Sequence, residues 1–247
     1  MKTYPRLKFC GITREIDVEG AIEAGACAIG LNFVPASKRY VSLRLAAELS
    51  RAAAGRIQRI GVFVNATPQH VADVLHVCEL DAIQLHGDEP VEWLHQAQQF
   101  EGLRDLPVLR GLPYRGVDDD TMIAAWSDQV FDPVSPVCAI LIDAYDPKTR
   151  GGTGKTARWD LLSPRPHSFC LPATDPRFTS MTPPAPLILA GGLQPSNIAT
   201  ACEIAKPNGV DVASGIETEP GIKDRDAMLA MAESVRRYFQ DHLPSPQ

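Results

Sequence analysis

The sequence predicts a single (β/α)8 barrel, an α/β fold in which eight parallel strands close into a cylinder surrounded by helices. The chain has 247 residues, a usual size for one such domain. Short apolar runs alternate with amphipathic stretches, and these runs lack strict alternation, as expected for parallel strands that are covered on both faces. A doubly wound open sheet is the runner-up, but the G-x-G-x-x-G motif that usually follows its first strand is absent.

Eight apolar runs are the expected strands. They are Arg6–Cys10, Cys27–Phe33, Ile57–Val64, Ala82–Leu85, Val108–Leu112, Cys138–Asp143, Leu187–Ala190 and Gly209–Ala213.

Helical patterns follow these strands. Thr13 is expected to cap a helix that Gly25 closes, Ser42 opens the next, and Thr67 precedes a proline at the first turn of a third. Further helices are expected at Pro90–Gln99, Asp118–Ser127, Pro195–Ala205 and Asp224–Phe239, with a short candidate at Arg158–Leu162.

One segment interrupts this alternation. Residues 163–186 contain seven of the 21 prolines and no clear periodicity, so we expect a long proline-rich surface loop inserted before strand 7. No domain boundary is evident, so residues 1–247 are expected to form one barrel domain, with 241–247 as a disordered tail.

Composition and charge restrict the possible partners. The formal net charge is −6 and no basic run occurs, which disfavours nucleic acid. No stretch approaches 18 consecutive apolar residues, and the start of the chain is polar, so we expect neither a membrane span nor a secretory signal but a cytoplasmic protein. The six cysteines show no C-x-x-C spacing, so neither disulfides nor a metal site are expected.

In such a barrel the chemistry belongs at the carboxyl ends of the strands. Strands 7 and 8 end in Gly191-Gly192 and Ser214-Gly215. Glycine lets backbone N–H groups approach an anion closely, and two such turns on neighbouring strands predict a phosphate site. The sequence Gly151 to Lys155, GGTGK, lacks the full P-loop spacing and is interpreted as a loop over the pocket.

Candidates for proton transfer end two other strands. Cys10 closes strand 1, and a thiol becomes a base or nucleophile only when it is deprotonated. Asp143 closes strand 6, where a buried carboxyl group could stay protonated and act as a general acid. From position alone, catalytic and structural roles for both residues stay equally open.

Three further residues are candidates for binding the substrate. Arg39 follows strand 2, where its guanidinium could grip a carboxylate with two hydrogen bonds. His86 at the end of strand 4 could contact a ligand or be a hydrogen-bonded core residue. Asp211 lies inside strand 8, where a buried charge needs a partner, and this favours a structural role.

Seven segments in order resemble a known family. KFCGIT, SKRYVS, GVFVN, QLHGDE, ILIDAYDPKTRGGTGK, LAGGL and VDVASGIE are similar to signature segments of phosphoribosylanthranilate isomerase, an enzyme of tryptophan biosynthesis. The resemblance implies an Amadori rearrangement without metal or cofactor, in which N-(5-phosphoribosyl)anthranilate becomes 1-(2-carboxyphenylamino)-1-deoxyribulose 5-phosphate. It implies a (β/α)8 barrel that binds a small phosphosugar and exists as a monomer or homodimer.

The resemblance also implies roles for individual residues. Asp143 falls on the family's general acid and Cys10 on its general base. Arg39 falls on the residue that holds the anthranilate carboxylate, and the glycine turns fall on the phosphate-binding turns. The departure from the family pattern is the long segment 163–186.

Three other kinds of phosphosugar barrel differ from this isomerase in the residues that they need. Indole-glycerol-phosphate synthase, a related barrel, relies on a lysine acid and does not need Cys10. The corresponding isomerase of histidine synthesis uses two aspartates, and Cys10 replaces the first. A phosphosugar-binding barrel without catalysis would need neither Cys10 nor Asp143.

Overall fold

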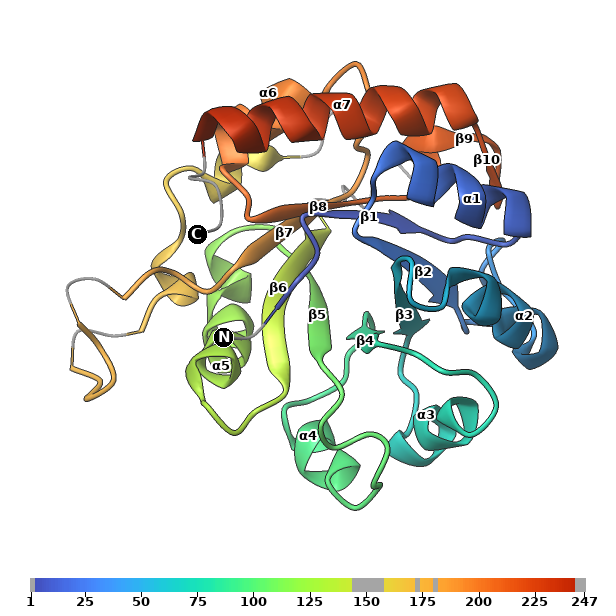
Figure 1. Ribbon diagram of the computed structural model, residues 1–247. Helices are drawn as coiled ribbons and strands as arrows, with labels where there is room; N and C mark the ends of the chain where they lie inside the picture. Colours follow the sequence, from blue (N-terminus) through green and yellow to red (C-terminus); the bar gives the residue numbers. More distant parts are fainter. Residues whose placement is uncertain (1–2, 144–157, 172–173, 180–181, 243–247) are drawn as a thin grey trace.

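The computed structural model describes residues 3–143, 158–171, 174–179 and 182–242. Eight parallel strands form a closed barrel in the order of the chain, and β1 pairs with β8 to complete it. Figure 1 shows the barrel viewed along its axis, with helices around it. The strands are β1 (Leu7–Cys10), β2 (Ala28–Asn32), β3 (Gln58–Phe63), β4 (Ala82–Leu85), β5 (Val108–Pro113), β6 (Val137–Asp143), β7 (Leu187–Ala190) and β8 (Gly209–Val212).

Seven α-helices surround the barrel in the described part of the chain. They are α1 (Glu15–Ala24), α2 (Leu43–Ala53), α3 (Pro68–Leu75), α4 (Glu92–Ala97), α5 (Asp120–Phe131), α6 (Ile198–Ala205) and α7 (Arg225–His242). Short 3-10 helices add η1 (Val117–Asp119), η2 (Trp159–Leu162), η3 (His167–Phe169) and η4 (Ser214–Ile216), and a small hairpin is formed by β9 (Glu217–Glu219) and β10 (Ile222–Lys223).

Two apolar clusters stabilise this arrangement. The larger lies between the sheet and the helices and includes Phe9, Leu49, Ile83, Trp126 and Met231. The smaller is built from alternate strand residues with short or branched side chains, such as Ala28, Ile60, Leu109 and Ile188, and fills the interior of the barrel. The interior of the barrel is therefore a packed core.

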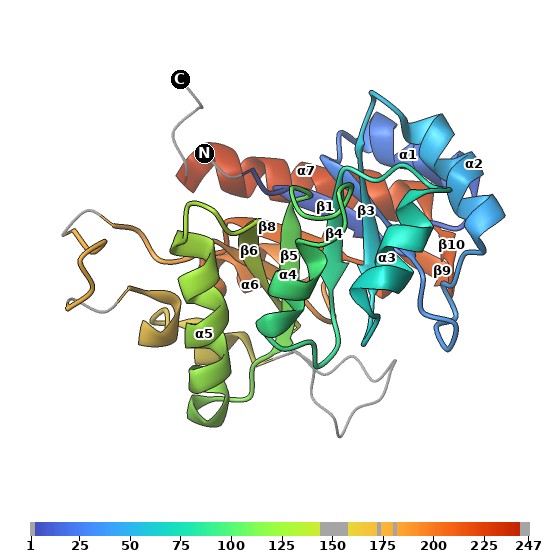
Figure 2. The same ribbon diagram turned by 90° about the horizontal axis from the view of Figure 1, so that it is seen from below.

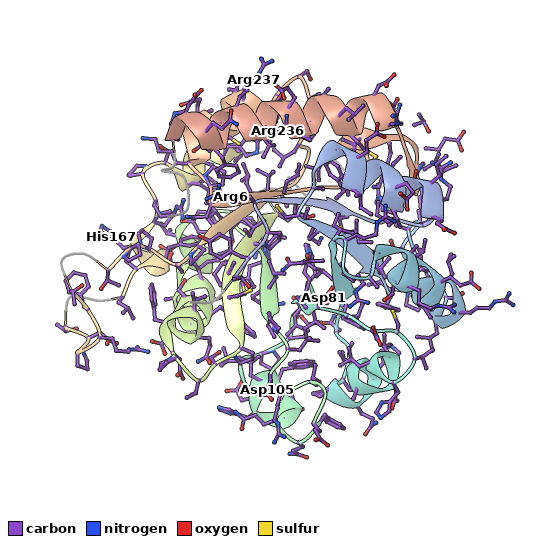
Figure 3. All side chains as sticks on the ribbon, in the orientation of Figure 1. Arg6, Asp81, Asp105, His167, Arg236 and Arg237 are labelled. Carbon is purple, nitrogen blue, oxygen red and sulfur yellow. The ribbon has the colours of Figure 1, made fainter. Side chains whose placement is uncertain are left out.

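Figure 3 helps to distinguish the two ends of the barrel. It labels Arg6, Asp81 and Asp105, which precede β1, β4 and β5 and so mark the amino-terminal end of the sheet. The carboxyl ends of the strands, where Cys10 and Asp143 lie, face the opposite way. Figure 2 shows the molecule turned by 90°, so that the two ends can be seen from the side.

Most helix ends agree with the sequence prediction, with one correction. Ser42 accepts a hydrogen bond from Leu45 N at 3.3 Å, and Gly25 closes α1 in the left-handed region with φ 79°. Thr13, in contrast, does not cap α1. The helix begins at Glu15 after the extended Arg14, and the Thr13 hydroxyl donates to the Gly221 carbonyl instead.

The prediction of one helix after every strand is also wrong in one place. After β6 the described residues form only the 3-10 helices η2 and η3, and α6 follows β7. The β9–β10 hairpin was not predicted. Its strands are only three and two residues long, too short to give a recognisable pattern.

The proline-rich segment is only partly a surface loop. Figures 1 and 2 show that it extends outward beyond α5. Yet Phe169 in η3 is fully buried, and Ser168 Oγ donates to Asp120 Oδ1 on α5 at 2.8 Å. The residues around η3 therefore belong to the outer core, and the exposed part is the described stretch 174–179. The expected tail is described only to His242, where α7 ends, and the rest lies outside the described residues.

Candidate active site

Cys10 is the last residue of β1 and lies partly exposed at the carboxyl end of the barrel. Its neighbour on β2 is Gly30, where an added Cβ would stand 2.8 Å from the Cys10 Sγ. Gly11 has φ 76°, and a Cβ there would lie 2.3 Å from the Cδ of Arg39. Glycine is therefore required at both positions, because one leaves space for the thiol and the other lets Arg39 lie against the end of β1.

A buried ion pair lies directly below the thiol. Lys8, two residues before Cys10 on the same face of β1, is completely buried, and its Nζ donates to Asp211 Oδ1 on β8 at 2.9 Å. Asp211 was expected to bind substrate or to be structural. The structure shows it as the partner of Lys8, which satisfies the charge that strand 8 buries.

Arg39 also has a protein partner. Its Nε donates to Glu217 Oε1 at 2.8 Å and its Nη2 to Oε2 at 2.6 Å, and Glu217 is 4% exposed. Glu217 further accepts from Lys223 Nζ at 2.7 Å, and Lys223 donates to the Cys10 carbonyl at 2.6 Å. One edge of the Arg39 guanidinium is thus held in place, and the same network fixes the end of β1.

The surroundings of Cys10 act on its pKa in opposite directions. Burial raises the pKa of the Cys10 thiol, while the positive charge of Lys8 lowers it, and the net result is a raised pKa. Burial would lower the pKa of the Lys8 ammonium, but the Asp211 carboxylate and Cys10 raise it more. Burial likewise raises the pKa of the Glu217 carboxyl, but hydrogen bonds from Arg39 and Lys223 lower it overall.

Asp143 and His86 form the second polar group at this end of the barrel. Asp143 ends β6, and its Oδ2 lies 3.7 Å from His86 Nε2, which is beyond hydrogen-bond range. His86 lies over Gly111 of β5, where a Cβ would stand 2.5 Å from the His86 Nδ1. Gln84 Nε2 lies 2.7 Å from that Nδ1. This contact holds the imidazole ring in place, and which of the two groups donates depends on the tautomer of His86.

The glycine turns form the third group. Gly191 and Gly192 both have positive φ, 83° and 64°, as a tight turn after β7 requires. Ser214 and Gly215 begin η4 after β8, and a Cβ at Gly215 would collide with the Leu193 carbonyl at 1.8 Å. The two turns therefore touch, so their backbone N–H groups can serve one anion.

Sequence reasoning missed Lys8, Gln84, Glu217 and Lys223. A signal was available for Lys8, since it is a charge inside an apolar strand, as Asp211 is, and two buried charges of opposite sign in one barrel are expected to pair. Glu217 and Lys223 gave no such signal, because the hairpin that brings them to Cys10 is not visible in the sequence pattern.

The other predictions on this site concern metals, membranes and a loop. Within the described ranges, His, Cys, Asp and Glu side chains form no group of three or more that could hold a metal ion. None of the described helices combines the length and the hydropathy that crossing a membrane demands. All six cysteines are free thiols. The glycine-rich sequence 151–155 lies outside the described residues.

Comparison with known proteins shows the family to which the chain belongs. A family model described as N-(5'phosphoribosyl)anthranilate (PRA) isomerase matches residues 7–234. The N-(5'-phosphoribosyl)anthranilate isomerase of Myxococcus xanthus (strain DK1622) is 38% identical over 231 residues, 94% of this chain and 96% of the relative.

Solved structures give the same result. The crystal structure of phosphoribosyl anthranilate isomerase from Thermotoga maritima superposes with a TM-score of 0.75 at 32% identity, over 95% of this chain and 100% of that one. A second structure of this isomerase contains reduced 1-(o-carboxyphenylamino)-1-deoxyribulose 5-phosphate, and it superposes with a TM-score of 0.72 at 30% identity over 95% and 100% of the two chains. The chain therefore belongs to the N-(5'-phosphoribosyl)anthranilate isomerase family.

Proposed function

We propose that this protein isomerises N-(5-phosphoribosyl)anthranilate to 1-(2-carboxyphenylamino)-1-deoxyribulose 5-phosphate, with Asp143 as general acid and Cys10 as general base. The observation that carries this proposal is the placement of a thiol and a carboxyl group at the ends of β1 and β6, at one mouth of the barrel. The rearrangement needs only proton transfers, and one acid and one base are sufficient for them.

The steps follow from the chemistry of the substrate. Asp143 gives a proton to the ring oxygen of the ribose, the bond from C1 to that oxygen breaks, and the nitrogen lone pair forms a protonated Schiff base. The carboxylate left behind lies 3.7 Å from His86 Nε2. Cys10, as thiolate, then removes the proton from C2, and the electron pair moves through C1 to the nitrogen. The resulting enolamine becomes the ketone when C1 takes up a proton and the hydroxyl group on C2 loses one.

Two anchors would hold the ribose between the acid and the base. The turns at Gly191, Gly192, Ser214 and Gly215 present backbone N–H groups to the phosphate. Glu217 holds the Nε edge of Arg39, so the Nη1 side of the guanidinium is the one that meets the anthranilate carboxylate. Binding at both ends of the substrate positions its reacting centre.

The test is an assay of purified protein for loss of the anthranilate-type fluorescence of phosphoribosylanthranilate. We expect turnover by the unaltered protein. Cys10→Ser and Asp143→Asn should each lower kcat by about 10²–10⁴-fold, because a hydroxyl is a far weaker base than a thiolate and an amide delivers no proton. Cys27→Ser and Asp105→Asn, at exposed positions, are matched controls that should retain activity.

Two other results of this assay would contradict the proposal. Absence of turnover by a folded protein that binds the product would identify a phosphosugar-binding barrel without catalysis. Loss of less than about tenfold in either variant would remove that residue from its assigned role.

A further inference from the structure

Burial of the charged Lys8 side chain costs free energy, and the fold alone does not require a charge at this position. An ammonium group inside a protein loses its hydration, and its ion pair with Asp211 offsets this loss only in part. Ala28, the partner of Lys8 on β2, and Ile60 on β3 are apolar residues of the smaller cluster inside the barrel. An apolar side chain at position 8 would fill the same space without the charge, so a further role for Lys8 is indicated.

The position of Lys8 relative to the thiol suggests that role. Lys8 and Cys10 point to the same side of β1 and converge on Gly30 of β2. A Cβ at Gly30 would stand 2.8 Å from the Cys10 Sγ and 3.0 Å from the Lys8 Nζ. The two atoms are therefore neighbours over one glycine, and the positive charge of Lys8 lowers the pKa of the thiol.

The charged groups around Cys10 leave one positive charge uncompensated. Lys8 from β1, Lys223 from β10 and Arg39 from the loop after β2 are cations that act on the thiol. Asp211 from β8 is the carboxylate beside Lys8, and Glu217 from β9 is the carboxylate between Arg39 and Lys223. Three cations and two carboxylates leave room for one more negative charge. A thiolate at Cys10 would supply it.

We propose that Lys8 is a positioning residue whose ammonium group stabilises the thiolate of Cys10, and that Asp211 holds this ammonium in place. The inference rests on the proposed function for the catalytic role of Cys10, but not for the ionisation itself. Lys8 opposes the effect of burial, which raises the pKa of the Cys10 thiol and without the ammonium group would leave still less thiolate. Lys8 acts through Cys10 and takes no part in the transfer of atoms.

Alkylation of Cys10 measures its ionisation without any assay of turnover. The rate of reaction with iodoacetamide, followed by mass spectrometry of the peptide that contains Cys10, gives the midpoint of its titration against pH. Lys8→Met should move this midpoint upward by about one pKa unit or more. Asp211→Asn should move it downward, because the Asp211 charge raises the pKa of the thiol. A structural loosening of the barrel would not produce shifts of opposite sign.

Two further variants serve as controls, one for unfolding and one for the loss of a positive charge elsewhere. Lys8→Met leaves the buried Asp211 without its partner and so destabilises the fold. Lys8→Gln with Asp211→Asn avoids this, because it replaces the ion pair by a hydrogen-bonded amide pair. Its midpoint should still rise, since the effect of Lys8 on the thiol exceeds that of Asp211. Lys38→Met removes an exposed cation from the same loop as Arg39 and should leave the midpoint unchanged.

The outcomes separate this inference from the proposed function. An unchanged midpoint in folded Lys8 variants would overturn the inference, whatever the activity. A midpoint that rises as expected supports it. If the acid limb of kcat/KM then rises by the same amount, Cys10 is also the base. If that limb stays where it was, Lys8 still stabilises the thiolate, and the assignment of Cys10 as base fails.

Discussion

Arg39 is a residue whose function depends on a protein partner. A free guanidinium on a loop would lose side-chain entropy on binding a carboxylate, but Glu217 already fixes one of its edges with two charge-assisted hydrogen bonds. Lys223 holds Glu217 in turn, at 2.7 Å. The arginine is therefore prepared for the substrate before the substrate arrives.

Glu217→Gln should raise KM more than it lowers kcat. The amide keeps one acceptor but loses the charge that holds Arg39, so we expect an increase in KM of about tenfold, in line with the loss of a hydrogen bond to a charged group. Arg39→Lys should change the constants in the same direction, because a lysine cannot present the same planar fork. Steady-state kinetics on both variants provide the measurement. Equal losses in kcat and kcat/KM would mean that the arginine acts in the transition state.

Candidate residues could be predicted from the sequence where a strand ends in a reactive side chain, as at Cys10 and Asp143. Their environment could not. His86 lies over Gly111 of β5, and Lys8 approaches the thiol over Gly30 of β2. Such contacts depend on the register between neighbouring strands, which the periodicity of one strand does not contain.

At the level of elements, β4 and its loop depend on a charge from β5. Arg110 is 1% exposed, pairs with Glu89 at 2.8 Å and donates to the carbonyls of Leu85 and Gly87. Its guanidinium also stacks on Trp126 of α5, 4.8 Å from the ring centre. One side chain therefore connects the loop that carries His86 with the next strand and the outer helix.

Arg110→Met should destabilise the protein by about 3–5 kcal/mol, because it leaves the buried Glu89 carboxylate without its partner. Urea denaturation of the variant measures this loss. Arg104→Met is the matched control, since Arg104 is half exposed and pairs only with an exposed carboxylate. A loss below about 1 kcal/mol for Arg110→Met would show that the loop is held by its backbone contacts.

The segment 163–186 should divide into two parts with different effects. Phe169→Ala empties a fully buried site and should cost about 3–5 kcal/mol of stability. Replacing residues 174–179 by a short glycine-serine linker should leave kcat and KM within about twofold, since this stretch lies outside every matched motif and long loops add little closure entropy. Melting curves and steady-state kinetics on both variants test this. A large loss of kcat in the linker variant would mean that the segment reaches the catalytic end of the barrel.

The strands were predicted to within one or two residues, and two of them, Ala82–Leu85 and Leu187–Ala190, without any difference. Buried parallel strands are continuous apolar runs and are easy to find. Elements that depend on contacts between residues far apart in the sequence were harder to predict. Thr13 has the ordinary chemistry of a helix cap, but the Gly221 carbonyl engages its hydroxyl from the far end of the sequence.

For the molecule as a whole, the ion pairs around the closure of the barrel predict sensitivity to acid. The folded structure lowers the pKa of Glu217 below its ordinary value of 4.5, overall through hydrogen bonds from Arg39 and Lys223 that outweigh burial. A carboxyl group with a lowered folded pKa adds stability that is fully present above 4.5 and is lost as the pH falls through the folded pKa. Stability should therefore decrease below about pH 4.5.

The comparison of Glu217→Gln with the unaltered protein isolates this contribution. The variant should have lower stability at pH 7 but a smaller further loss between pH 5 and acid, since it no longer contains the titrating group. Urea midpoints at several pH values provide the measurement, with the exposed Glu101→Gln as control. Parallel pH profiles for Glu217→Gln and the unaltered protein would show that other carboxyl groups dominate the acid response.

Gly30 and Gly111 have a consequence for how the gene of this enzyme tolerates mutation. Each lies beside a residue of the site on a neighbouring strand, and any side chain at these positions would occupy the place of the Cys10 thiol or the His86 ring. Every single-base change of a glycine codon that is not silent adds a side chain or stops translation. The genetic target for loss of activity is therefore larger than the codons of the reacting groups, and a screen for inactive alleles should recover substitutions at both glycines.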